Sequence, residues 1–128
     1  MRKNVIAVTL TLATVAMIAQ GCVLIAAAGA GAGTIAYIKG EFSAMEAKKL
    51  DTAYNATKKA LTQLKLSITK DNKDATSATI VARDAEDKKI TVRLTEAGDN
   101  ITKISIRIGV FGDKTKSEQI YQQIKKNL

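Results

Sequence analysis

The chain has 128 residues, of which 46% are hydrophobic and 25% are charged, and its formal net charge is +8. This length suits a single domain. The chain contains no histidine and only one cysteine. The sequence therefore excludes histidine-based metal sites, Ser-His and Cys-His catalysis, and any disulfide within the chain.

The amino-terminal segment has the pattern of a secretory signal peptide. Arg2 and Lys3 precede an uncharged, apolar run from Val5 to Ala19. A basic start followed by an apolar stretch of this length is typical of such peptides. The next residues place Cys22, the only cysteine, where a signal peptide is cut. We therefore predict a signal peptide over residues 1–21.

The end of this segment resembles the lipobox of bacterial lipoproteins, because a glycine precedes Cys22 and the small Ala19 lies three residues before it. The resemblance implies a diacylglycerol on the Cys22 sulfur, cleavage before Cys22 and an N-acyl chain on the new amine. Three acyl chains, at about 0.8 kcal/mol per buried methylene, give lasting attachment. Val23, where an aspartate favours inner-membrane retention in enteric lipoproteins, favours the outer membrane. Two alternatives stay open: an uncleaved helix that spans the membrane as far as Ala28, and a soluble secreted form.

Residues 22–36 are predicted to be the lipidated cysteine and a tether rich in glycine and alanine. Gly29, Gly31 and Gly33 alternate with alanine. We expect an apolar spacer close to the lipid surface, with a helix that self-associates through Gly29 and Gly33 as the alternative. A dinucleotide-binding loop is disfavoured, because such a loop needs a βαβ unit around it.

Residues 37–128 are predicted to form a globular α+β domain. Apolar residues recur at helical spacing from Leu50 to Leu64, and a last helix is expected after Asp113, a favourable N-cap. Between these helices apolar and polar residues alternate, which predicts an antiparallel meander with one buried face. We expect a single antiparallel sheet of about four strands, with the two amphipathic helices packed on one face.

Three local expectations complete this prediction. The segment 35–42 is interpreted as one strand with a bend or bulge at Gly40, and 71–74 as a turn. For Phe111, which stands between Gly109 and Gly112, a place in the core is favoured over an exposed recognition loop. The predicted core is aliphatic and poor in aromatics, which leaves room for cavities. It comprises Leu50, Tyr54, Leu61, Leu64, Ile80, Ile90, Val92, Leu94, Ile104, Ile106, Ile108, Phe111, Ile120 and Ile124.

Several of these features occur together in one known family. The chain resembles a domain-of-unknown-function family of small proteobacterial lipoproteins, of which the Francisella lipoproteins include examples. The resemblance covers essentially the whole chain. It implies an α+β domain in the cell envelope, and it supplies no catalytic residues. It rests on the lipobox, the Gly/Ala spacer and the segments AYIKGE (36–41), LDTAYNAT (50–57) and ISIRIGVFGD (104–113).

No catalytic, metal or cofactor site is predicted. The acidic residues at 71–74 and 84–87 fall in predicted turns and match no calcium loop. One basic cluster is the candidate site. If the isoleucines of the meander face the helices, the opposite face is basic and rich in hydroxyls, and it suits phosphates or carboxylates. The residues expected to bind an anionic partner there are Arg83, Lys89, Arg93, Lys103 and Arg107.

We therefore expect a non-enzymatic outer-membrane lipoprotein, anchored through Cys22, whose domain lies on the periplasmic or cell-surface side and binds an envelope partner. Candidate partners are lipopolysaccharide phosphates, anionic lipids, peptidoglycan carboxylates and an acidic protein. Nucleic acid is not expected as a partner, because export would separate the protein from the nucleic acids of the cell. The basic face also lacks aromatic side chains on which bases could stack. The alternative is a carrier with an apolar ligand between helices and sheet. A hydrolase with an unrecognised site is a third hypothesis.

Overall fold

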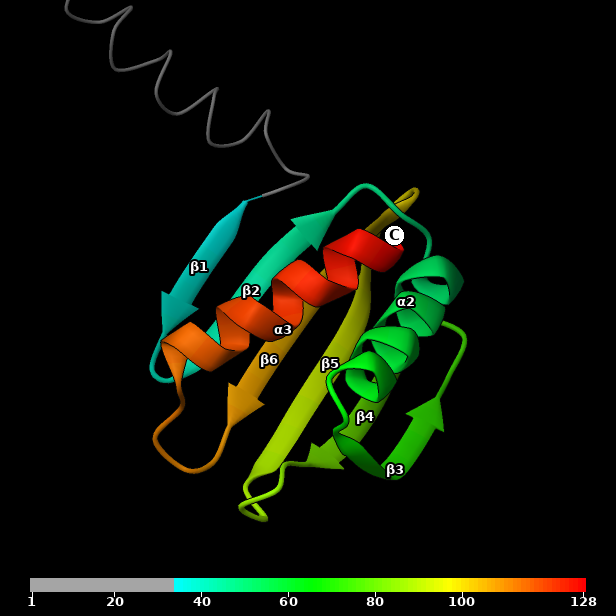
Figure 1. Cartoon of the computed structure of the whole chain (residues 1–128). Helices are drawn as coiled ribbons and strands as arrows, with labels where there is room; N and C mark the ends of the chain where they lie inside the picture. Colours follow the sequence, from blue (N-terminus) through cyan, green and yellow to red (C-terminus); the bar gives the residue numbers. More distant parts are fainter. Residues whose placement is uncertain (1–33) are drawn as a thin grey trace, which may run out of the picture. The chain divides into compact units, whose positions relative to one another are not determined.

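The computed structural model describes residues 34–128, so the predicted signal peptide, Cys22 and most of the predicted tether lie outside the described residues. The first strand begins at Ile35, inside the segment expected to be tether. Along the chain the elements are β1 (Ile35–Ile38), β2 (Glu41–Glu46), α2 (Leu50–Gln63), β3 (Ser67–Lys73), β4 (Ser77–Arg83), β5 (Lys89–Gly98), β6 (Ile101–Ile108) and α3 (Lys114–Asn127) (Figure 1).

The strands form one antiparallel sheet in the order β1-β2-β6-β5-β4-β3. Both helices lie on one face of it, with α2 over β3, β4 and β5 and α3 over β2 and β6 (Figure 1). The α+β class, the single antiparallel sheet and the two-helix layer are thus confirmed. The strand number is not, because six strands are present where about four were expected.

One additional strand comes from a tight turn at Lys39 and Gly40. Both residues have positive φ, at 52° and 81°, which is the backbone of a two-residue hairpin turn whose twist matches that of its strands. Ile38 pairs with Glu41 directly across this turn. The segment 35–42 is therefore two strands rather than one bent strand. The prediction missed the turn because lysine seldom adopts positive φ.

The other difference is β3, which continues through the segment predicted to be a turn. Asp71 and Lys73 both lie within it, at an exposed edge. The Tyr54 hydroxyl of α2 donates to Asp71 at 2.7 Å, and the Lys58 ammonium lies 2.9 Å from the same carboxylate. Lys73 pairs with Asp51 of α2 at 2.7 Å. These contacts with the helix offset the low intrinsic strand preference of Asp and Lys.

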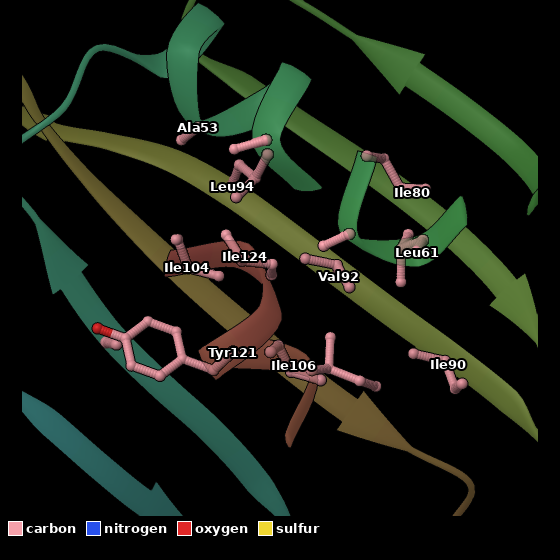
Figure 2. Close-up of a cluster of buried hydrophobic side chains, with 14 of the residues drawn as sticks. Ala53, Leu61, Ile80, Ile90, Val92, Leu94, Ile104, Ile106, Tyr121 and Ile124 are labelled. Atoms are coloured by element: carbon pink, nitrogen blue, oxygen red, sulfur yellow. The ribbon is translucent and has the colours of Figure 1, made fainter. Parts of the chain in front are cut away.

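The core lies between the sheet and the helices (Figure 2). The strand register sets Phe42, Ile106, Val92 and Ile80 in one row across four strands, and all four are fully buried. Tyr121 of α3 packs against Phe42, with ring centroids 5.1 Å apart and the ring planes tilted by 47°. Each fully buried side chain of this size contributes about 1.5–3 kcal/mol relative to an exposed one.

Eleven of the fourteen predicted core residues are buried, and three are not. Tyr54 of α2 is half-buried, and Leu64, just after the end of α2, is exposed. Phe111 is the clearest correction, since it is 91% exposed. The loop Gly109–Gly112 carries it away from the helix layer, so it does not plug the core. Phe42, Tyr121 and six alanines, which the prediction did not select, fill the remaining core positions.

The helix ends are defined by local hydrogen bonds. The Asp113 carboxylate accepts the backbone N–H of Lys116 at 3.0 Å, which confirms the predicted N-cap of α3. At the end of α2, Lys65 has φ +58°, and the N–H groups of Lys65 and Leu66 donate to the carbonyls of Thr62 and Leu61. This is a Schellman motif with lysine where glycine is usual. In the part of the chain described, no helix is both long and apolar enough to cross a bilayer.

Candidate functional site

The face of the sheet opposite the helices, here called the open face, carries the predicted basic cluster. Because side chains alternate along a strand, burial of Ile90, Val92, Ile104 and Ile106 against the helices turns their neighbours to the other side. The three strands β4, β5 and β6 lie side by side in the middle of the sheet. The cluster on them consists of Arg83 on β4, Lys89 and Arg93 on β5, and Lys103 and Arg107 on β6.

The register brings these residues close together. Arg93 lies directly opposite Ser105, so Lys103 and Arg107, two residues to either side, are its diagonal neighbours. Diagonal pairs on one sheet face are about 7–8 Å apart, within reach of long side chains. Arg83 and Lys89 lie directly opposite one another at the end of β4 and β5. All five predicted residues therefore belong to one continuous surface.

Two depressions lie on this surface. One, of about 200 Å³, is bounded by basic, hydroxyl and acidic side chains, namely Glu41, Lys89, Thr91, Arg93, Ser105 and Arg107. The second, of about 310 Å³, lies towards β1 and β2 and is bounded by Ile38, Lys39, Glu41, Ser43, Lys103 and Arg107. Arg107 and Glu41 border both depressions. The volume of the first suits a single phosphate or carboxylate group rather than a large ligand.

Two of the five cations hold the protein's own backbone. The Arg107 guanidinium donates to the carbonyl of Lys39 at 3.1 Å and to that of Val110 at 2.8 Å. It therefore ties the β1–β2 turn to the loop after β6. The Arg83 guanidinium donates to the Asp87 carbonyl at 2.8 Å and lies 3.5 Å from its carboxylate. Both arginines therefore have a structural role, which the sequence did not indicate.

The other three cations are available to a ligand. Within residues 34–128, the side chains of Lys89, Arg93 and Lys103 form no ion pair and no hydrogen bond. They lie beside further positive charges, and like charges at neighbouring strand positions repel one another. A bound anion removes that repulsion, so the arrangement favours negatively charged ligands.

Sequence reasoning missed three members of this face. Glu41 lies opposite Arg107 in the register and is the one acidic side chain at open-face strand positions among residues 34–128. Lys70 lies opposite Val81 and adds a cation near the β3 edge. Lys39 lies in the hairpin turn that borders the second depression. Recognition of the Lys39–Gly40 hairpin would have found Glu41 and Lys39, because it sets the alternation of β2.

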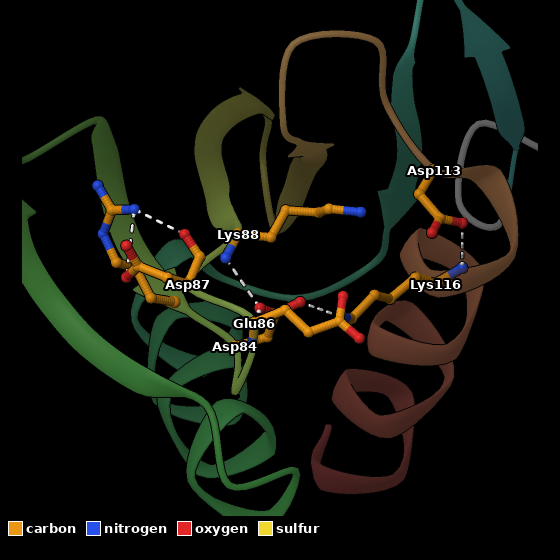
Figure 3. Close-up of polar contacts among 7 residues, drawn as sticks. Asp84, Glu86, Asp87, Lys88, Asp113 and Lys116 are labelled. Atoms are coloured by element: carbon orange, nitrogen blue, oxygen red, sulfur yellow. Dashed lines mark hydrogen bonds and ion pairs between the residues drawn. The ribbon is translucent and has the colours of Figure 1, made fainter.

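The acidic turn between β4 and β5 is structural (Figure 3). Asp84 accepts the backbone N–H groups of Glu86 at 2.9 Å and Lys88 at 2.8 Å, and its carboxylate pairs with the Lys116 ammonium. The Lys116 ammonium, together with the two N–H groups, holds the pKa of Asp84 below its usual range. In residues 34–128 no group of three or more Asp, Glu, His or Cys side chains is arranged to hold a metal ion.

The helix side carries two open grooves at the edges of the helices. One, of about 360 Å³, lies between the end of α2, α3 and the β4–β5 turn, and Leu64, Leu66 and Ile120 contribute its apolar surface. The other, of about 650 Å³, runs between α3 and the first two strands. It is bounded by Ile35, Phe42, Leu64, Thr115, Glu118, Gln119, Tyr121, Gln122, Gln123 and Lys126. Polar side chains of α3 make up most of that boundary.

Comparison with known proteins places the chain in a family. No curated protein matches the sequence. One family, described as a protein of unknown function, DUF3568, matches residues 4–127, which is nearly the entire chain. The predicted resemblance to a family of unknown function is therefore confirmed. The lipoprotein character of the resemblance stays a prediction. This chain belongs to the DUF3568 family of proteins of unknown function.

Proposed function

We propose that this chain is a non-enzymatic, lipid-anchored protein of the bacterial outer membrane, and that the open face of its sheet binds an anionic envelope partner. One observation carries the proposal. Within residues 34–128, Lys89, Arg93 and Lys103 form no ion pair, and they border shallow depressions that also present Thr91 and Ser105 and that contain one carboxylate, Glu41. Guanidinium, ammonium and hydroxyl groups are the donors that proteins use for phosphates and carboxylates.

The partner chemistry follows from this set of donors. Phosphates of lipopolysaccharide or of anionic lipids, peptidoglycan carboxylates and an acidic protein all satisfy it. The chain is oriented towards the periplasm or the cell surface in this proposal. Nucleic acid is not among the expected partners, since the described residues of the open face include no aromatic side chain for base stacking.

Titration with small anions tests the binding face directly. Inorganic phosphate and a short acidic peptide are added separately to the isotope-labelled protein, and amide shifts are followed by NMR. We expect shifts centred on Thr91, Arg93 and Ser105, lost in the double variant Arg93→Glu/Lys103→Glu. Arg107 is left intact, because its replacement would disturb two loops.

A matched control keeps the overall charge change equal. Lys59→Glu/Lys126→Glu places the same two reversals on the exposed sides of α2 and α3. It should bind phosphate like the wild type. Shifts spread evenly over the surface, or equal losses in the two double variants, would mean that net charge rather than this face attracts anions.

The anchor has its own test. Cells are fed an alkyne-tagged palmitate, and wild type is compared with Cys22→Ala after inner and outer membranes are separated. Label that is lost in the variant, and found with the outer membrane in the wild type, supports the proposed anchor. An unlabelled protein in the inner membrane would favour a spanning helix instead.

A lipid carrier is the second candidate function, and the groove of about 650 Å³ beside α3 is the observation that favours it. Ligand sites in proteins commonly have volumes of about 300–1,000 Å³. The groove is open to solvent along its length, so an apolar ligand would leave much of its surface in water there. Native protein that releases a lipid on denaturation, detected by mass spectrometry, would support the carrier.

A further inference from the structure

The largest exposures of apolar side chains in residues 34–128 occur together at one end of the sheet. Phe111 is 91% exposed, Val110 77% and Ile38 66%. Val110 and Phe111 stand in the loop between β6 and α3, and Ile38 ends β1 at the neighbouring turn (Figure 1). We propose that these three side chains, the apolar tip, insert into the surface of a bilayer that carries anionic lipids.

Hydrogen bonds and close backbone contacts hold the tip in a fixed position. Arg107 donates to the backbone carbonyls of Lys39 and Val110 and so joins the two segments that carry the tip. Gly40 and Gly112 bring the two backbones into close contact, and a Cβ on Gly40 would lie 2.6 Å from the Phe111 carbonyl oxygen. A loop fixed in this way loses little conformational freedom when it binds.

The surroundings of the tip are basic. Lys39 follows Ile38 directly, Arg107 lies at the base of the loop, and Lys114 begins α3 just after it. Two carboxylates lie among these cations, Glu41, opposite Ile38, and Asp113, which accepts the Lys116 N–H, so the three cations outnumber the acids by one. Each lysine or arginine near an anionic bilayer strengthens binding to that bilayer about fivefold. Their long stems also allow the charges to reach the headgroups while apolar neighbours go deeper.

The size of the tip favours lipid over protein. Three side chains offer on the order of a few hundred Å² of apolar surface. A stable protein–protein interface needs about 800 Å² from each partner, together with complementary shape. A fluid bilayer needs neither. The tip is also continuous with the open face, since Ile38 and Lys39 border the depression that contains Lys103. Apolar insertion and contacts with headgroup phosphates can therefore occur together.

The proposal rests on the envelope location of the proposed function, but not on anion binding by the open face. The chain contains no tryptophan, so Phe111→Trp creates a single tryptophan, at the tip, whose emission is excited separately from that of the three tyrosines; this variant is here called the tip reporter. Ala75→Trp, in the exposed β3–β4 turn, creates the matched control, the turn reporter. Both full-length variants are mixed with vesicles of phosphatidylglycerol and phosphatidylcholine in equal parts, with and without brominated acyl chains.

We expect the emission of the tip reporter to shift to shorter wavelength and to be quenched by the brominated lipid, whereas the turn reporter changes in neither respect. Phosphatidylcholine alone should give a weaker effect. Ile38→Ser, added to the Phe111→Trp chain, should lower the vesicle partition of the tip about tenfold, because serine removes the apolar surface that isoleucine buries in the bilayer. Ile35→Ser, on the same strand, should leave the partition unchanged.

Two results would overturn the proposal. In the first, the tip reporter stays exposed to water while the protein is bound to vesicles, or behaves like the turn reporter. In the second, the emission of the tip reporter shifts without vesicles as protein concentration rises, which would mean that a second copy covers the tip.

One further variant separates this proposal from anion binding by the open face. Arg93→Glu/Lys103→Glu is added to the Phe111→Trp chain, and vesicle quenching and phosphate binding are both measured. Quenching that persists while phosphate binding is lost supports both proposals. If the Phe111→Trp chain binds phosphate but is not quenched by the vesicles, the result contradicts insertion of the tip and leaves anion binding by the open face intact.

Discussion

The ammonium of Lys116, in the first turn of α3, forms an ion pair with the carboxylate of Asp84 at the end of β4. The two residues are 32 positions apart in the sequence. Asp84 also accepts two backbone N–H groups of its own turn, so one carboxylate joins the β4–β5 turn to the last helix (Figure 3). Only 7% of its side chain is exposed, and loss of the charge therefore matters for stability.

Asp84→Asn should lower the free energy of unfolding near neutral pH and flatten its dependence on acid pH. The pKa of Asp84 is depressed in the folded state. Its contribution is therefore present above the ordinary aspartate pKa of about 3.9 and is lost as the pH falls through the folded value. Urea unfolding between neutral and acid pH measures this difference. Glu118→Gln, which removes an exposed pair with Lys114 on the same helix, should change little. If the unfolding free energies of Asp84→Asn and wild type depend on acid pH in the same way, the stabilising role of the ionised Asp84 carboxylate is contradicted.

Gly112→Ala should destabilise the protein by about 3 kcal/mol, and Gly109→Ala by about 1 kcal/mol. Both glycines have positive φ, at 81° and 63°. A Cβ on Gly112 would also lie 2.6 Å from the Gly40 Cα and 2.7 Å from the Tyr37 hydroxyl, whereas one on Gly109 meets only the Lys88 side chain at 3.7 Å. Chemical unfolding of the two variants measures both losses. Gly109→Ala reports the backbone strain, and the additional loss in Gly112→Ala reports the steric overlap. Equal losses would mean that the close approach of the two loops adds nothing.

Tyr121→Phe should cost about 1 kcal/mol at neutral pH, because the buried Tyr121 hydroxyl donates to the Glu46 carboxylate. Burial, and then the hydrogen bond to Glu46 and the charge of Glu46, raise the pKa of Tyr121. The folded state therefore holds this proton more tightly, and its contribution is present below the ordinary tyrosine pKa of about 10 and is lost as the pH rises further.

Unfolding experiments from neutral to alkaline pH test this expectation. The stability of the wild type should fall above about pH 10, and Tyr121→Phe should remove part of that fall. Tyr37→Phe is the control, since the Tyr37 hydroxyl makes no hydrogen bond with residues 34–128. An alkaline profile unchanged by Tyr121→Phe would contradict the role of the Glu46 contact.

Lys65→Gly should stabilise the protein by about 0.5–1 kcal/mol, although it removes a side chain. Lys65 has φ +58° at the end of α2, a conformation that costs lysine energy and glycine almost none. Lys59→Gly in the middle of the same helix should have the opposite sign, with a loss of about 1 kcal/mol. Thermal unfolding of Lys65→Gly and Lys59→Gly, each compared with the wild type, measures the sign of the two stability changes. A loss in both would show that the Lys65 side chain has a contact that compensates its backbone.

The helices and the central strands could be predicted because their signals are local. The stripe from Leu50 to Leu64 repeats at helical spacing, and Asp113 caps its helix through a residue three positions away. The alternation of Ile104 and Ile106 with Lys103 and Ser105 sets the two faces of β6 without reference to any partner. The open face and its five basic residues follow from the same alternation.

The β1–β2 hairpin, the edge strand β3 and the apolar tip could be recognised only from the tertiary structure. Lys39 takes positive φ in a turn whose carbonyl accepts from Arg107, 68 residues away in the sequence. Asp71 stays in a strand because Tyr54 and Lys58 of α2 contact it. The sequence pattern carries no signal for either contact.

By itself, the sequence determined the α+β class, the positions of both helices and the side of the sheet on which each residue of the central strands lies. Periodicity and capping act within a few residues, so composition and spacing suffice for them. Only the tertiary structure decided the strand number, the pairing of Arg83 and Arg107 with backbone carbonyls, and the exposure of Phe111. The burial of a loop residue depends on where distant elements end, and here the β1–β2 turn occupies the space beside the loop and leaves Phe111 in solvent.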